Sequence, residues 1–206
     1  MAFSYYLNME CMSLEIAKDH ASNMTDSNYD TEIEPFLNEN ALKNNMKQGY
    51  VIVTSLYTFA ESFLNTILRD CMLCRENLLK GLSLENKLEV IFLFYKVDLA
   101  TLKSDSHYAI LTKVTGIRNE LIHYKKNYIG VGSGIPGFSI KKSDIADFFV
   151  KSNMENVIKA IISFADFVAE QLGLIVHKDV GIFCCDGRDD LVSYVYDPAI
   201  TEARFE

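Results

Sequence analysis

The sequence predicts an all-α protein, a helical bundle of about five helices with a small C-terminal appendage. Three observations predict this class. The chain has 206 residues, enough for one domain with a sizeable core. It contains only 3 prolines and 10 glycines, several of the glycines in one loop, so long stretches are free of helix breakers. Along these stretches apolar residues recur at steps of three and four, which is the spacing of one helix face.

The first four predicted helices follow from this spacing and from residues that favour helix ends. The first covers Leu7 to about Ala21 and is followed by a polar segment rich in turn residues. The second runs from about Leu42 to Arg75, a length that is typical of a bundle. The third begins near Ser83, because serine is favoured at helix N-caps. The fourth begins near Ser104 or Asp105 and ends at the segment NYIGVGSGIPGF, whose four glycines and one proline cannot sustain a helix.

A fifth helical segment closes the bundle. Ser143 or Asp144 is expected to cap it, Asn153 is a possible second start, and Gly173 is expected to end it. The predicted helical bundle therefore spans residues 1–173, and residues 174–206 form the appendage. In the appendage, GIFCC and LVSYVY flank an Asp-Gly pair and can form a short β-hairpin.

The charge distribution separates one segment from the rest of the chain. The formal net charge is −8, which is unfavourable for broad binding to nucleic acid. The segment from Lys113 to Lys142, however, contains six basic residues and one acidic residue. Its net charge is therefore +5, and the remainder of the chain carries −13. The basic residues surround the stretch GIRNELIHYKK, and those at Lys113, Lys125, Lys126, Lys141 and Lys142 are candidates for contact with RNA.

The sequence also predicts a cytoplasmic setting without a membrane span. The first residues, MAFSYYLNMECMSLE, have neither a basic start nor a clean apolar run. The most apolar window, VIKAIISFADFVAEQLG, is interrupted by three charged residues. Five cysteines, an odd number without a regular framework, favour a reducing compartment.

Neither a metal nor a cofactor is expected. Cys71 and Cys74 have C-x2-C spacing, but no second pair with zinc-site spacing accompanies them. The loop GVGSGIPG follows no strand and lacks the Lys-Ser/Thr pair of a P-loop, so a loop facing a substrate is the preferred interpretation.

Three polar residues of the fourth helix can meet at its C-terminal end. Asn119 and His123 are four residues apart and share a helix face, while Arg118 lies about 140° around the helix and about 7.5 Å along it from His123. Histidine can move protons near neutral pH, and arginine can stabilise the charge on a phosphate. These groups are sufficient for RNA cleavage without a metal, in which the ribose 2′-OH is the nucleophile.

The stretch RNELIH, together with the upstream segment SLYTFAESFLNTIL, resembles the HEPN domains (higher eukaryotes and prokaryotes nucleotide-binding). RNELIH fits their R-x4-H motif, and the upstream segment resembles their second helix, over roughly Tyr50 to Tyr124. The resemblance implies that Arg118 and His123 are the catalytic pair of a metal-independent endoribonuclease and that Asn119 supports them. It also implies a homodimer whose two motifs face one shared cleft. Many such domains are toxins or abortive-infection effectors, so an antitoxin or regulatory protein is a further possible partner.

Two alternatives remain open at this point. Glu61 lies on the apolar side of the second helix, where it either supports the site by pairing with Arg118 or forms a structural ion pair that fixes helix register. The whole chain can likewise be a non-catalytic HEPN-like module that binds RNA, a nucleotide or a protein.

Overall fold

The computed structural model describes residues 9–28, 38–72, 81–122, 144–173, 175–177 and 193–195. Within these ranges the chain forms seven α-helices and one π-helical turn, named α1 (Met9–Ser22), α2 (Glu39–Thr66), η1 (Ile67–Cys71), α4 (Leu84–Phe94), α5 (Leu99–Ser104), α6 (Ser106–Ile122), α7 (Asp144–Phe148) and α8 (Lys151–Leu172). The predicted all-α bundle is confirmed.

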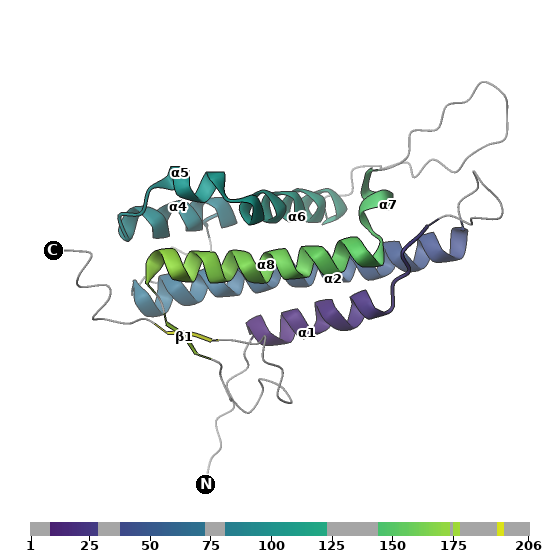
Figure 1. The fold of residues 1–206 in the computed structure, drawn as a ribbon, viewed down its shortest axis with the longest axis horizontal. Coiled ribbons are helices and arrows are strands. Elements are labelled where there is room, and N and C mark those ends of the chain that lie inside the picture. Colours follow the sequence, from purple (N-terminus) through teal and green to yellow (C-terminus); the bar gives the residue numbers. More distant parts are fainter. Residues whose placement is uncertain are drawn as a thin grey trace, which may run out of the picture.

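The central element is α2, which contacts α1, α4, α6 and α8 (Figure 1). Its inward face presents fully buried apolar residues such as Ile52, Leu56 and Leu64, which join one continuous core with residues of α8 such as Ile161. Burial of this face stabilises the bundle, at about 25 cal/mol for each Å² of apolar surface removed from water. The same packing holds α6 against both α2 and α8.

The helix ends agree with the sequence at several positions. Ser83 caps α4, its Oγ accepting a hydrogen bond from Asn86 N at 3.2 Å. Asp105 caps α6, its Oδ1 accepting from His107 N at 2.8 Å. Gly173 ends α8 in the left-handed conformation with φ of 65°, which glycine adopts without a steric cost from Cβ.

Three features of the helices differ from the prediction. The helix expected from about Leu42 to Arg75 begins at Glu39 and changes to the π-helical turn η1 after Thr66. A separate short helix, α5, precedes α6 and is capped by Asp98, whose Oδ1 accepts from Ala100 N at 2.9 Å. Its six residues are too few for a helical periodicity to be visible in the sequence. The last helix restarts at Lys151 rather than at Asn153, after a break that includes the buried Phe149 between α7 and α8.

The N-terminus of α8 is capped by a residue from a distant part of the chain. Its N-cap position, Val150, makes no side-chain hydrogen bond to the helix. Instead, Asp26 accepts a hydrogen bond from Ser152 N at 2.9 Å, and Thr25 O accepts from Lys151 N at 3.0 Å. The segment after α1 therefore fixes where α8 begins.

Buried asparagines hold the same end of the bundle together. Asn45 of α2 is fully buried and accepts from Thr25 N at 3.0 Å, while its Nδ2 donates to Asn28 Oδ1 at 2.7 Å. Asn28 in turn donates to Ala146 O of α7. The hydrogen-bonding groups of these two amides are thus matched where water is excluded.

The appendage contains a two-stranded antiparallel pair, β1 (Ile175–His177) and β2 (Ser193–Val195), with Val176 opposite Tyr194. The predicted strand in LVSYVY is present, but its partner is the segment that directly follows α8. The GIFCC segment expected to pair with it, and the Asp-Gly turn, lie outside the described residues.

One stretch of the described residues, Glu39–Arg69, is long and apolar enough to cross a membrane. Half of its most apolar window is buried inside the bundle. This is weak support for a membrane span, because the core helix of a soluble protein has the same length and composition.

Candidate functional site

Arg118 and Asn119 lie in the last turns of α6, and the structure brings them together. Arg118 donates from Nη1 to Asn119 Oδ1 at 3.0 Å. The guanidinium carbon of Arg118 lies 4.4 Å from the centre of the Tyr57 ring of α2, a cation–π contact. Its Nε is buried without a hydrogen-bond partner among the described residues. The guanidinium is therefore held in one orientation with donor capacity left over.

His123 follows Ile122, the last described residue of α6, and lies outside the described residues. So do four of the five lysines predicted to contact RNA, namely Lys125, Lys126, Lys141 and Lys142. Their placement and the meeting of His123 with Arg118 stay predictions. Lys113 is described, and its ammonium lies 4.5 Å from the centre of the Phe148 ring of α7.

Glu61 forms the structural ion pair that was one of the two alternatives. Its Oε1 lies 2.8 Å from Nζ of Lys87 in α4. Lys87 is only 2% exposed, whereas Glu61 is 40% exposed. The carboxylate of Glu61 therefore neutralises the ammonium of Lys87, which is buried between α2 and α4. Glu61 lies one helical turn after Tyr57 on α2. A supporting role of Glu61 in the site stays a prediction.

The surroundings of Tyr57 raise the pKa of its hydroxyl above the usual value. Burial raises the pKa of Tyr57, the nearby Glu61 carboxylate raises it further, and Arg118 lowers it. Burial also raises the pKa of Tyr108 on α6, with a contribution from Glu85.

These shifts predict a loss of stability at alkaline pH. A tyrosine in the unfolded chain ionises near pH 10, while Tyr57 in the folded protein stays protonated to a higher pH. The unfolded state therefore binds fewer protons above pH 10, so the free energy of unfolding falls as pH rises from there. Urea unfolding between pH 9 and 11 should show this fall. The slope should be shallower in Tyr57→Phe than in the wild type, and equal slopes in the two proteins would contradict the prediction.

A cavity of about 230 Å³, here called the polar cavity, opens beside Arg118 between α2, α4 and α6. It is lined by Tyr57, Ser83, Leu84, Glu85, Leu88, Tyr108, Leu111, Thr112, Thr115 and Asn119. Tyr57 and Asn119 are the two residues that hold the Arg118 guanidinium, so the polar cavity and Arg118 share part of their walls.

Sequence reasoning missed the polar cavity, although α6 carries a signal for it. Tyr108, Thr112, Thr115 and Asn119 follow one another at steps of three and four, a polar stripe beside the apolar stripe that forms the core. Only the packing of α4 and α6 against α2 turns that stripe into a cavity wall.

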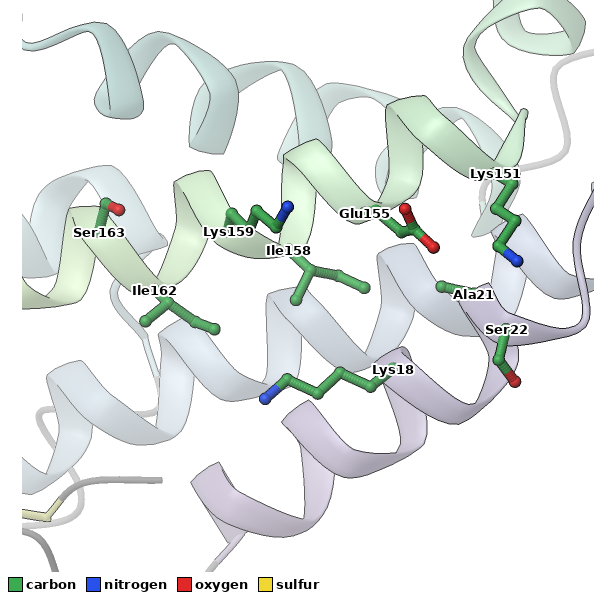
Figure 2. Close-up of a pocket in the computed structure, with 9 residues that line it drawn as sticks. All are labelled: Lys18, Ala21, Ser22, Lys151, Glu155, Ile158, Lys159, Ile162 and Ser163. Atoms are coloured by element: carbon green, nitrogen blue, oxygen red, sulfur yellow. The ribbon is translucent and has the colours of Figure 1, made fainter. Parts of the chain in front are cut away.

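A second, larger cavity of about 520 Å³, the lysine groove, runs between α1 and α8 (Figure 2). Ala21, Ile158 and Ile162 supply its apolar lining. Around them lie Lys18, Lys151 and Lys159, with Glu155, Ser22 and Ser163. Three cations against one anion make this groove locally basic in an acidic chain. Neither Arg118 nor Asn119 lines it.

In the part of the chain that the structure describes, no three His, Cys, Asp or Glu side chains are grouped so that they could hold a metal ion. Cys74, Cys184 and Cys185 lie outside that part.

Comparison of the chain with protein-family models, with curated proteins and with solved structures found no match in any of the three.

Proposed function

We propose that the protein is a metal-independent endoribonuclease of HEPN type with a composite active site at a homodimer interface. One observation carries the proposal. Arg118 is held by the Tyr57 ring and by Asn119 at the end of α6, so a forked cation is presented five residues before a histidine and within the most basic segment. A residue that stabilises a transition state must be held in a fixed orientation, and packing supplies this.

In the proposed reaction the 2′-oxygen of a ribose attacks the adjacent phosphorus, and the bond from phosphorus to the 5′-oxygen breaks. His123 of one protomer accepts the proton of the 2′-OH, and His123 of the other protomer donates a proton to the leaving 5′-oxygen. Arg118 stabilises the additional negative charge on the phosphoryl oxygens. The products are a 2′,3′-cyclic phosphate and a 5′-OH, and no other reactant is consumed.

A homodimer supports this scheme chemically. The base and the acid act on opposite sides of one in-line displacement, and a single imidazole does not reach both. A two-fold axis that brings two copies of the R-x4-H stretch together supplies both groups. We place such an enzyme in the cytoplasm, where its RNA substrate occurs, as a toxin or defence effector restrained by an antitoxin or regulatory protein.

Cleavage of a total-RNA pool and a tRNA pool in the presence of EDTA tests the proposal. We expect the wild type to cut, His123→Ala to be inactive, and Arg118→Ala to lose about 10²–10³-fold in rate, the usual effect of losing one transition-state donor. Arg69→Ala removes an exposed arginine from η1 and should cut like the wild type. Each variant's thermal unfolding must match the wild type, so that a loss of rate is not a loss of fold. Absence of cleavage by a folded wild type, or equal rates in all variants, would refute the proposal.

The alternative is a non-catalytic module of the same fold that binds a ligand or a protein. The observation that favours it is the lysine groove, which is larger than the polar cavity and lies on other helices. In that case the wild type should not cut RNA, and Lys151→Glu combined with Lys159→Glu should abolish binding of an acidic partner. If the wild type cuts RNA, or if the paired change leaves binding of an acidic partner unaltered, the alternative fails.

A further inference from the structure

The geometry points to a nucleobase-binding subsite in the polar cavity that prefers cytosine and adenine to uracil. The inference deepens the proposed function and rests on it, because it assigns the cavity to one base of the RNA whose phosphate contacts Arg118.

The size of the polar cavity suits a single base. Its volume of about 230 Å³ lies below the roughly 300–1,000 Å³ of sites for drug-sized molecules. A folded RNA segment or a protein surface is far too large to enter this cavity. A planar ring with a few polar edge atoms is of the right size.

The walls of the polar cavity match a planar, polar-edged ring. Tyr57 and Tyr108 contribute aromatic surface, and Leu88 and Leu111 contribute aliphatic surface, on which the face of a base can lie. The Thr115 hydroxyl, which has no hydrogen-bond partner among the described residues, and the Asn119 amide supply groups for the edge of a base.

The charges explain where a phosphate would lie. Among the described residues, Glu85 is the only charged one that lines the polar cavity, and its carboxylate repels an anion. Arg118 is not part of the described lining, but it contacts Tyr57 and Asn119, which both line the cavity. A nucleotide with its base in the cavity can therefore place its phosphate against Arg118. The base then contacts the polar and apolar lining of the cavity, and the phosphate contacts a cation.

Glu85 sets the expected base preference. Its Oε1 accepts a hydrogen bond from the Tyr108 hydroxyl at 3.4 Å, which is long, and it keeps free acceptor capacity. A carboxylate accepts from the exocyclic amino group of cytosine and, by the same chemistry, of adenine, whereas uracil presents a carbonyl oxygen there. We expect cytidine and adenosine to be preferred to uridine.

The experiment measures binding of cytidine, adenosine and uridine 3′-monophosphates, with inorganic phosphate as a probe that lacks a base. The proteins are the wild type, Tyr108→Ala, Glu85→Gln and two matched controls. Tyr50→Ala removes an exposed tyrosine of α2, and Glu89→Gln removes a carboxylate one turn further along α4. We expect Tyr108→Ala to weaken the binding of cytidine and adenosine monophosphates about fivefold or more, because stacking on the tyrosine ring is lost. Glu85→Gln should remove the preference over uridine, and the controls should bind like the wild type.

Each result separates this inference from the proposed function. Nucleotide binding that depends on Tyr108 without any RNA cleavage would support the subsite and refute the nuclease. RNA cleavage that depends on Arg118 and His123, with nucleotide binding equal in Tyr108→Ala and Tyr50→Ala, would overturn the subsite and leave the nuclease standing. Binding of inorganic phosphate as tight as that of the nucleotides would also overturn the subsite, since the base would then contribute nothing.

Discussion

Replacing Glu61 by alanine should destabilise the protein by about 3 kcal/mol. The substitution leaves the ammonium of Lys87 almost completely buried without its partner, which lies 2.8 Å away in the intact protein. Removing one partner of a buried ion pair costs about 3–5 kcal/mol, and the low end applies because Glu61 itself is 40% exposed. Urea or thermal unfolding of the two proteins measures the difference.

A matched pair on the same helix provides the control for Glu61. Glu39 and Lys43 are both largely exposed and form an ion pair at the start of α2. Glu39→Ala should change stability little, because water screens exposed pairs. The double variant Glu61→Gln/Lys87→Met should recover most of the loss, since an apolar side chain no longer requires a counter-charge. If Glu61→Ala unfolds like Glu39→Ala, the charge of Lys87 is not effectively buried and the explanation fails.

Replacing Gly49 by alanine should cost about 2 kcal/mol net. A Cβ at Gly49 would lie 2.6 Å from Cδ1 and Cδ2 of Phe149 and closer still to Cγ, and Phe149 is fully buried. Such overpacking costs up to about 3 kcal/mol. The gain in helix propensity from glycine to alanine offsets about 1 kcal/mol of this. The midpoint of urea unfolding at constant slope measures the net effect.

Gly116 of α6 is the control for Gly49, because a Cβ there meets no atom within 4 Å. Gly116→Ala should therefore stabilise the protein by about 0.5–1 kcal/mol through helix propensity alone. Combining Gly49→Ala with Phe149→Leu should lose less than the sum of the single changes, since the smaller side chain removes the clash. Stabilisation by Gly49→Ala alone would show that α2 and the α7–α8 junction are not in close contact.

Prediction from the sequence succeeded where local signals are strong. The long helices α2, α6 and α8 each carry an apolar stripe over many turns, and Ser83, Asp105 and Gly173 end or begin helices as their side chains and backbone preferences dictate. It failed at α5, which is too short to show a period, and at the start of α8, which Asp26 fixes from another part of the chain.

The candidate site was predicted in part. The sequence identified Arg118 and Asn119 and placed them on one helix, and the structure adds what holds them. The contact of Arg118 with Tyr57 joins residues 61 positions apart, and no pattern within α6 or α2 indicates it. The same is true of the pairing of Glu61 with Lys87, because the sequence analysis named only Arg118 as a partner and left the partner of a structural ion pair unnamed.

The sequence by itself therefore determined the fold class, the long helices, the helix ends at Ser83, Asp105 and Gly173, and the stretch worth testing, because these depend on residues close together in the chain. Only the tertiary structure decided which helix faces meet. That choice buries Lys87 beside Glu61, packs Gly49 against Phe149 and converts the polar stripe of α6 into a cavity beside Arg118. Such contacts depend on the relative position of whole helices, a property that no local spacing of residues specifies.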